Sequence, residues 1–445
     1  MANTKLTQTF ASAGTGTKWT LSAWIKRSAT GIDQYIMSRY VNSTKYVKIL
    51  FNDADTLEYS VYNNNAGGYQ ARYKTSAKYR DISAWYHIVI AQDSSLGTAA
   101  DRVKFYVNGE LITSFGTNTQ IGQNVAGDFN NATAHQIGAY NSTNYFQGSM
   151  SHFHFCDNQQ YAASDFGSVD STTGEWEINT SPSVSYGTTG FTILKDGNTI
   201  TDQSANSNNW TLGSGTLTNT EDCPSDNFAT LNPLGSGTFT FSNGNNTAIR
   251  STSSSFHTAI SNLGASSGKY YAEAKAISIG SVTYGSYIGF INLDVTNKQN
   301  TAGVNIGEGT DSAGISSGGG YIYYNGNQFA GPTTATTNGD IVNLAMDLDN
   351  GRLYWGINGT YLNSGNPASG SSGTGGMPIA NLIAGGTYTF GVSLRNDANY
   401  SWNFGNGYFG TTAIASEGSN ASGIGIFEHD VPSGYTALST KGLNL

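Results

Sequence analysis

The sequence predicts an all-β protein, and three observations carry the prediction. Apolar residues recur at every second position from Trp19 to Ile25 and again from Val103 to Val107, which is the period of a strand with one buried face. No long stretch repeats apolar residues at the three-to-four-residue spacing of a helix. Short apolar runs are separated by Asn-Gly pairs, which favour two-residue hairpin turns and begin at Asn108, Asn243, Asn325, Asn338, Asn358 and Asn406.

The composition and charge of the chain limit the range of functions it can have. The chain has 445 residues, enough for two or three domains. Charged residues make up only 11%, against roughly 25% in ordinary globular chains, while Gly (56) and Tyr (27) are plentiful. The net charge is −9, and no basic stripe appears, so we expect no nucleic-acid binding.

Four segments follow one another within the first 160 residues: KWTLSAWIKRS, SAWYHIVIAQD, DRVKFYVNGELITSF and YFQGSMSHFHFCD. Their order, with Phe10 before them and YAASDFGSVDSTTGEW after them, resembles the laminin G-like, concanavalin-type domains that are abundant in tail-fibre and other surface proteins of marine bacteriophages. The resemblance runs to about residue 190 and implies a lectin-like antiparallel β-sandwich.

A second set of segments begins near Asn227. It runs from GKYYAEAKAI through YIGFINLD and NGDIVNLAMDLDNGRLYWGING to WNFGNGYFG, and it resembles a SPRY domain, another antiparallel sandwich. The most specific stretch places a turn at Gly339, a tight turn at 349–351 and a return strand with Leu353, Trp355 and Ile357 on one face.

These resemblances divide the chain into four parts. We expect a laminin G-like sandwich over 1–167, a polar connector with an edge strand near Phe191 over 168–226, a SPRY-like sandwich over 227–413, and a C-terminal block over 414–445. Within that block, VPSGYTAL resembles a closing motif of phage tail-fibre-like sequences.

The N-terminal sequence and the cysteines bear on localisation. MANTKLTQTF has no basic region followed by an apolar core, so we expect no signal peptide, and no apolar run reaches the ~18 residues of a membrane span. Cys156 and Cys223 are too few for a disulfide framework. A virion protein that is assembled in the host cytoplasm and released by lysis reconciles these features with an adhesin-like composition.

Enzymatic motifs are absent from the sequence. A polysaccharide hydrolase on a concanavalin-type sandwich is expected to carry Glu-x-Asp-x-x-Glu on a strand, and the chain has no such spacing. Glu175 and Glu177 flank Trp176, but they lie in the polar connector and fit a solvated turn. We therefore predict no enzyme activity, and two carboxyl groups ~5–10 Å apart in a groove would reverse this prediction.

Metal-ligating patterns are weak. His152, His154 and Cys156 occupy alternate positions of one expected strand, but the apolar Phe153 and Phe155 between them favour a structural histidine pair over a metal site. We predict no cofactor, with Ca²⁺ as the alternative. Two clusters of residues offer oxygen ligands: Asp53 with Asp55, and Asp347 with Asp349 and Asn350. A tight turn already explains the residues of the second cluster.

Tyrosine-rich segments are the candidates for recognition. Tyrosine rings can stack on sugar faces beside amide and hydroxyl donors, and they also suit protein contacts. The alternative is that half of these rings fill the sandwich cores. The predicted binding residues are Tyr62, Asn64, Tyr69 and Tyr73 in the first sandwich, and Tyr321, Tyr323, Tyr324 and Asn325 in the second.

The sequence thus predicts a non-enzymatic phage virion surface protein, such as a fibre or appendage, that adheres to surface polysaccharides or proteins of the host or its environment. Its other partners would be virion structural proteins and further copies of itself, with a homotrimer favoured by analogy with fibres. The main alternative is a structural protein that decorates the capsid or tail and contacts only other virion subunits.

Overall fold

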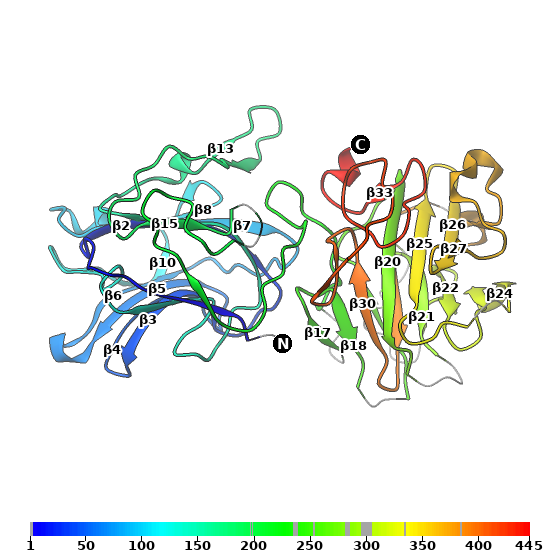
Figure 1. Ribbon diagram of the computed structural model, residues 1–445, viewed down its shortest axis with the longest axis horizontal. Coiled ribbons are helices and arrows are strands. Elements are labelled where there is room, and N and C mark those ends of the chain that lie inside the picture. The colour runs from blue at the N-terminus through cyan, green and yellow to red at the C-terminus, as the bar shows by residue number, and fades with distance from the viewer. Residues whose placement is uncertain are drawn as a thin grey trace. The chain divides into compact units, whose positions relative to one another are not determined.

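A computed structural model describes residues 3–195, 197, 199–234, 239–251, 254–280, 285–294, 305–332, 335–382 and 385–445. The chain forms two compact units, Met1–Asn219 (unit 1) and Thr220–Leu445 (unit 2). Each unit contains two large, mainly antiparallel sheets, visible as separate layers in Figure 1. The predicted all-β fold of two antiparallel sandwiches is confirmed.

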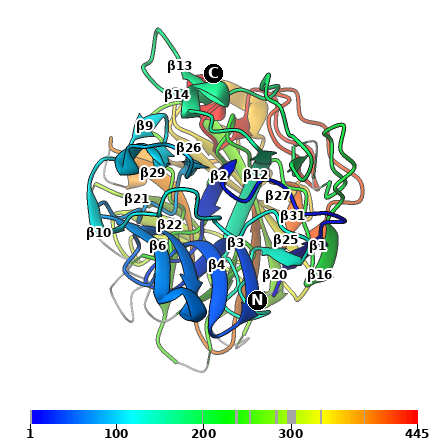
Figure 2. The same ribbon diagram turned by 90° about the vertical axis from the view of Figure 1, so that its left-hand side faces the viewer.

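The first sheet of unit 1 has eight strands among the described residues. In spatial order they are β10 (Phe115–Thr119), β6 (Gly68–Thr75), β5 (Leu57–Asn63), β4 (Lys45–Phe51), β3 (Gln34–Asn42), β11 (Ala134–Ile137), β1 (Lys5–Thr9) and β16 (Thr211–Ser214). In Figure 2, β3, β4 and β6 of this sheet lie towards the viewer.

The second sheet of unit 1 is packed against the first. Its strands are, in order, β15 (Phe191–Ile193), β12 (Gly148–Asp157), β2 (Lys18–Arg27), β7 (Trp85–Asp93), β8 (Val103–Val107) and β9 (Glu110–Leu111). A small separate hairpin joins β13 (Gly167–Val169) to β14 (Trp176–Ile178). Segment 168–226, which we expected to be a connector, therefore adds β15 and β16 to the two sheets of unit 1.

The core of unit 1 explains the alternation seen in β2. Trp19, Leu21 and Ile25 are fully buried between the sheets. Thr20 and Ser22, on the opposite face of β2, are buried as well. A second apolar cluster covers that outer face, and it joins residues of β7 and β12 to the segment that follows them: Val89, Cys156, Ala163 and Phe166, with Tyr161, Trp176, Val184 and Tyr186 packed against them.

Unit 2 repeats the two-sheet plan with different strand lengths. One sheet contains β17 (Thr240–Ser242), β18 (Thr247–Ile249), β30 (Asn399–Asn403), β20 (Lys269–Ser278), β25 (Ile341–Asp347), β26 (Arg352–Ile357) and β27 (Thr360–Tyr361), with β28 (Met377–Pro378) beside β26 and β33 (Thr436–Ala437) beside β20. The other contains β19 (His257–Ile260), β29 (Tyr388–Leu394), β21 (Tyr287–Asn292), β22 (Ser312–Ser316), β23 (Ile322–Tyr324) and β24 (Asn327–Ala330). A separate short hairpin joins β31 (Tyr408–Phe409) to β32 (Thr412–Ala413).

Helical structure in the described part of the chain is limited to short 3-10 turns. They are η1 (Asn64–Ala66), η2 (Ala99–Asp101), η3 (Ala163–Asp165), η5 (Pro367–Ser372), η6 (Ile379–Asn381) and η7 (Gly442–Asn444). Within these residues, no helix has the length and apolar character that crossing a membrane requires.

Three of the six Asn-Gly pairs close two-residue hairpins, and both residues of each of these pairs have positive φ, as a type I′ turn requires. At the β8–β9 turn, for example, φ is 48° at Asn108 and 83° at Gly109. The other two such turns join β23 to β24 and β26 to β27. Asn243 and Gly244 also have positive φ, but they lie in a four-residue loop between β17 and β18.

The C-terminal block packs on the outer face of the larger sheet of unit 2. Phe427, Val431 and Tyr435 bury their rings and methyl groups against Tyr271 and Tyr354. The only parallel strand pair among the described residues, β33 with β20, forms at this contact.

A buried carboxylate anchors the same block. Glu273 on β20 is fully buried and accepts hydrogen bonds from the backbone N–H groups of Glu428 (3.0 Å) and His429 (2.8 Å). The Tyr271 hydroxyl (3.0 Å) and the Asn403 amide (3.2 Å) also donate to it. One side chain of the sheet therefore satisfies two backbone donors of the C-terminal block.

We expect Glu273→Gln to loosen this block. The amide turns an acceptor oxygen into an NH₂ group that faces donors, and losing hydrogen bonds to a buried charge costs roughly 1.5–3 kcal/mol each. Urea unfolding should show that loss, and limited proteolysis should cut faster within 414–435. Glu417→Gln, at an exposed carboxylate of the same block, is the control and should change neither. Equal effects of the two substitutions would contradict the anchoring role.

Candidate binding surfaces

The strand register of unit 1 separates the four predicted binding residues. On β5, Leu57, Tyr59 and Val61 face the core, so Tyr62 lies on the outer face. Tyr62 pairs with Tyr69 on β6, and their rings meet edge to face with centroids 5.0 Å apart. Tyr73 is 3% exposed and faces the core. Asn64 is exposed on η1, with its side chain 3.5 Å from the Tyr62 hydroxyl.

Further tyrosines that sequence reasoning did not select join Tyr62 and Tyr69. Tyr46 on β4 stacks on Tyr62 with centroids 5.0 Å apart, and its hydroxyl lies 3.4 Å from that of Tyr69. Tyr140 meets Tyr46 edge to face at 5.8 Å. The contacts continue to β3 through Tyr35, which stacks on Tyr140 at 4.8 Å, and Tyr40, which meets it edge to face at 5.1 Å.

We call this set the tyrosine face: Tyr35, Tyr40, Tyr46, Tyr62, Tyr69 and Tyr140. It crosses β3, β4, β5 and β6, and three strand spacings correspond to roughly 14 Å. All of these rings except Tyr35 remain half-buried, so their edges reach the surface. Burial raises the pKa of Tyr140 to about 12 and raises that of Tyr46 further, so both hydroxyls stay protonated and can donate hydrogen bonds at neutral pH.

The only Asp or Glu within the eight strands of this sheet is Glu58, which lies on the same face. It is 2% exposed and accepts from Ser60 Oγ (2.6 Å), Arg72 Nε (3.2 Å) and Lys74 Nζ (3.2 Å). Burial alone would raise the pKa of Glu58, but the Ser60 hydrogen bond and the neighbouring cations, including Lys48, outweigh burial and lower it. Glu58 therefore stays ionised and is unsuited to act as a general acid.

The tyrosines of unit 2 are divided in the same way. On β23, Tyr324 packs against the core beside Ile322, whereas Tyr323 lies on the other face. The ring centroids of Tyr321 and Tyr323 lie 6.0 Å apart, and Asn325 is exposed at the hairpin turn. Tyr323 lines an open pocket of about 270 Å³ together with Tyr287, Asn305, Gly307, Glu308 and Gly326.

The histidines on β12 occupy structural positions. A β-bulge between Ser151 and His154 interrupts the strand, and His152 in it has a φ of 46°. The alternation expected from His152 to Cys156 is therefore broken. His154 is 2% exposed, with Nδ1 2.9 Å from the Tyr186 hydroxyl. Throughout the described residues, no group of three or more His, Cys, Asp or Glu side chains is placed to hold a metal ion.

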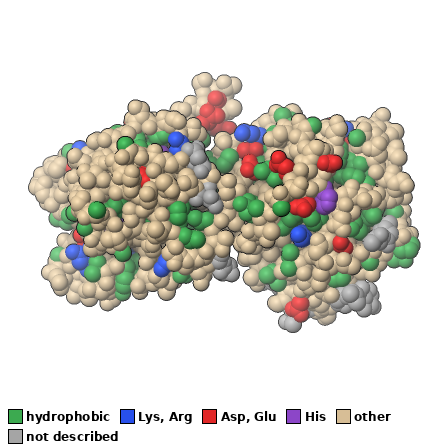
Figure 3. All heavy atoms as spheres, in the orientation of Figure 1, with side chains coloured by type: hydrophobic (Ala, Val, Ile, Leu, Met, Phe, Trp, Pro, Cys, Tyr) green, Lys and Arg blue, Asp and Glu red, His purple; other side chains and the backbone are tan. Residues whose placement is uncertain are grey.

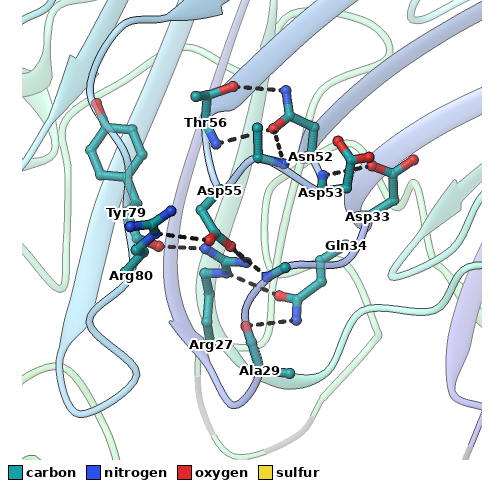
Figure 4. Close-up of polar contacts among 12 residues, drawn as sticks. Arg27, Ala29, Asp33, Gln34, Asn52, Asp53, Asp55, Thr56, Tyr79 and Arg80 are labelled. Atoms are coloured by element: carbon teal, nitrogen blue, oxygen red, sulfur yellow. Dashed lines mark hydrogen bonds and ion pairs between the residues drawn. The ribbon is translucent and has the colours of Figure 1, made fainter. Parts of the chain in front are cut away.

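Asp55, Asp347 and Asp349, three of the acidic residues considered for Ca²⁺, have protein partners. Asp55 bridges Arg27 (2.9 Å) and Arg80 (3.1 Å), and Figure 4 shows both guanidinium groups directed at its carboxylate. The backbone N–H of Asp53 donates to Asp33. In unit 2, Asp347 pairs with Lys269 and accepts from the backbone and side chain of Asn350, while Asp349 accepts from the Gly268 N–H.

A buried Ser–His contact in unit 1 does not form an activated nucleophile. Ser22 Oγ lies 2.9 Å from His87 Nε2, and Trp176 Nε1 donates to His87 Nδ1 at 2.9 Å. An indole N–H can only donate, so His87 Nδ1 is the acceptor and Nε2 carries the proton. The Ser22 hydroxyl therefore cannot pass its proton to this histidine. Glu175 and Glu177, on either side of Trp176, are exposed.

Comparison with known proteins supports the domain predicted for the first part of the chain. Residues 3–160 match the model of a family described as the concanavalin A-like lectin/glucanases superfamily, laminin G type. That description covers both sugar binding and sugar hydrolysis. No curated protein matches the chain.

Among solved structures, the chain is similar to three SPRY domains, each at 13% identity. The SPRY domain of human HERC1 has a TM-score of 0.30, and the match covers 39% of this chain and 96% of that one. The TRIM65 PSpry domain has a TM-score of 0.31, with 39% and 88% covered. A further human SPRY domain has a TM-score of 0.27, with 37% and 94% covered. The two-sheet architecture of unit 2 rests on its own strand pairing.

Proposed function

We propose that this protein is a non-enzymatic adhesin on the surface of a phage virion, as a fibre or appendage, and that it binds surface glycans through the tyrosine face of unit 1. The continuous run of ring contacts across four neighbouring strands carries this proposal. Concanavalin-like domains are often binding modules, which supports the general assignment.

The chemistry of the tyrosine face suits a sugar chain. Aromatic faces and edges contact the apolar side of a sugar ring, while phenol hydroxyls donate and accept hydrogen bonds at its rim. The rings lose little conformational entropy on binding because they already contact one another. A run of roughly 14 Å across the strands favours an extended ligand over a single small molecule.

The strands of the same face do not supply both groups that hydrolysis needs, and Asp33, which precedes β3, accepts a hydrogen bond from the Tyr35 hydroxyl (3.3 Å). Glycoside hydrolysis usually requires two carboxyl groups about 5–10 Å apart, one of them protonated. The eight strands supply one carboxylate, Glu58, and two cations hold it ionised. This supports binding without turnover.

The virion assignment rests on the resemblance of two parts of the sequence, the first sandwich and the VPSGYTAL motif, to phage surface proteins. Its partners would be other virion proteins and further copies of this chain, with a trimer favoured. Several weak glycan sites on one particle would bind together with much higher avidity than any one of them.

We expect Tyr46→Ala combined with Tyr62→Ala to abolish most binding to bacterial surface polysaccharides. Two stacked rings contribute about 1–3 kcal/mol in all, so affinity should fall roughly tenfold or more. Binding of the purified full-length chain to a polysaccharide panel and to whole cells measures this loss. Tyr321→Ala with Tyr323→Ala, in unit 2, is the matched comparison and should leave binding intact. A folded wild-type protein that binds no surface would instead favour a decorating role among virion subunits.

A further inference from the structure

The eight-stranded sheet of unit 1 is strongly basic, although the chain as a whole carries a net charge of −9. Its strands contain one acidic residue, Glu58, against six basic ones: Lys5, Arg39, Lys45, Lys48, Arg72 and Lys74. Arg39 and Lys45 pair with Asp128, outside the strands. Figure 3 shows few charged side chains on the visible surface, most of which is tan or green.

Three of the cations share the outer face with the tyrosines. The register aligns Lys48 with Ser60, Ser60 with Arg72, and Glu58 with Lys74 across neighbouring strands. Because side chains alternate along a strand, all of these residues project to the side that carries Tyr46 and Tyr62. With Glu58 ionised, Lys48, Arg72 and Lys74 leave this face with a net positive charge.

Lys48 makes no direct ion pair with a carboxylate among the described residues. Its Nζ lies over the rings of Tyr35, Tyr46 and Tyr140, at 5.6, 5.6 and 5.7 Å from their centroids. Among the described residues, no Asp or Glu oxygen lies within 4.0 Å of it, because the Glu58 carboxylate contacts Arg72 and Lys74 instead. Lys48 thus lies over aromatic rings without a direct ion pair, although it is near enough to Glu58 to help lower the pKa of that carboxyl.

Arg72, on β6, also lies over a tyrosine ring of this face. Its guanidinium carbon lies 4.5 Å from the centroid of Tyr69, and its side chain remains 30% exposed despite the contact with Glu58. A planar guanidinium presents several donors, so Arg72 can contact Glu58 and still offer N–H groups to a ligand anion. Lys48 on β4 and Arg72 on β6 therefore both lie among the rings of the tyrosine face.

We propose that the ligand of the tyrosine face is an anionic polysaccharide, whose carboxylate or sulfate groups pair with Lys48 and Arg72 while its sugar rings contact the tyrosines. This inference rests on the proposed glycan-binding function and specifies its substrate class. A neutral glycan would cover the Lys48 ammonium without giving it a direct ion pair, whereas an anion would pair with it.

Dextran, dextran sulfate and polygalacturonate are suitable probes for the full-length chain. Dextran and dextran sulfate share a backbone and differ in charge, while polygalacturonate tests carboxylates against sulfates. We expect binding to at least one of the two anionic polymers, at least tenfold tighter than to dextran. Raising NaCl from about 0.05 to about 0.5 M, which shortens the Debye length several-fold, should weaken it strongly.

Lys48→Gln should reduce binding to the anionic polymer roughly tenfold and flatten its salt dependence. Lys104→Gln, at a β8 lysine on the other sheet that pairs with Asp101, is the control and should change neither. Thermal unfolding of both variants checks that they fold.

The outcomes separate the inference from the proposed function. Equal binding to dextran and both anionic polymers, lost in the Tyr46→Ala, Tyr62→Ala variant, would overturn the anionic ligand and leave the glycan-binding function standing. Binding that falls equally with Lys48→Gln and Lys104→Gln would reflect general charge attraction and overturn the inference as well. No binding to any glycan of the panel or to whole cells would overturn both.

Discussion

Acidification from pH 7 to about pH 4 is expected to unfold unit 1. His87, His135 and His154 all lie in this unit and are at most 2% exposed. Burial lowers the pKa of each to about 3, against 6.5 in an unfolded chain. The folded state keeps the three imidazoles neutral, while the unfolded chain protonates them as the pH falls below 6.5.

The sign of the effect follows from this difference. The stabilising contribution of the three neutral histidines to the free energy of unfolding is fully present above pH 6.5. It is lost as the pH drops towards 3, because the unfolded state binds three more protons. Each histidine contributes about 1.4 kcal/mol per pH unit, so the loss is on the order of 10 kcal/mol at pH 4, comparable to the total stability of a domain. Calorimetry across this pH range should show the unfolding temperature of unit 1 falling before that of unit 2.

A substitution at His135 tests this pH dependence most directly. Its Nδ1 lies 2.7 Å from the Thr133 carbonyl, its ring packs 5.1 Å from Phe10, and its Nε2 has no hydrogen-bond partner. His135→Phe should therefore fold and should reduce the pH slope of unfolding by about one third. An unchanged slope would show that this histidine is not buried in the neutral form.

Asp55→Asn is expected to cost about 3–5 kcal/mol of folding free energy, because it leaves a buried arginine without its counter-ion. The Arg27 side chain is 0% exposed and that of Asp55 is 5% exposed. Arg27 also donates to Gln34 (3.1 Å) and to the Tyr79 carbonyl. These neutral acceptors remain in the variant, but they cannot neutralise the guanidinium (Figure 4).

Asp55→Asn should add no backbone strain, because asparagine tolerates the positive φ of 64° at position 55. Asp101→Asn provides the control, since Asp101 pairs with Lys104 at a side chain that is 51% exposed, where an ion pair contributes about 0–1 kcal/mol. Urea unfolding of the two variants measures the difference. A loss below about 1 kcal/mol for Asp55→Asn would mean that Arg27 finds solvent or another partner.

Much of the fold could be predicted because its signals are local. The alternation from Trp19 to Ile25 and the turn at Asn108 depend on residues close together in the sequence, and the structure confirms both. The covering of the outer face of β2 could not be predicted in this way. It comes from the segment around Phe166 and Trp176, which follows β12 and packs back over β7.

The binding surface was only partly predictable, and β6 shows why. Tyr69 and Tyr73 are four residues apart and should share a strand face. Val61 pairs with Ala71 and Tyr62 with Tyr69, so Gln70 is an extra residue in β6. This bulge turns Tyr69 to the outer face while Tyr73 stays in the core.

Long-range pairing explains the residues that sequence reasoning missed. Tyr46 and Lys48 carry no local motif, and Tyr140 joins them from a turn after β11 only because β11 pairs with β3. Their selection required the register of the whole sheet.

The central claim is that the tyrosine face binds the glycan. Hydrogen–deuterium exchange of the full-length chain, with and without the tightest-binding polysaccharide of the panel, tests it most directly. We predict slower exchange in β3, β4, β5 and β6 and in the turn at Tyr140, with no change in β21–β23. Protection confined to unit 2, or to the segment covering β2 and β7, would contradict it.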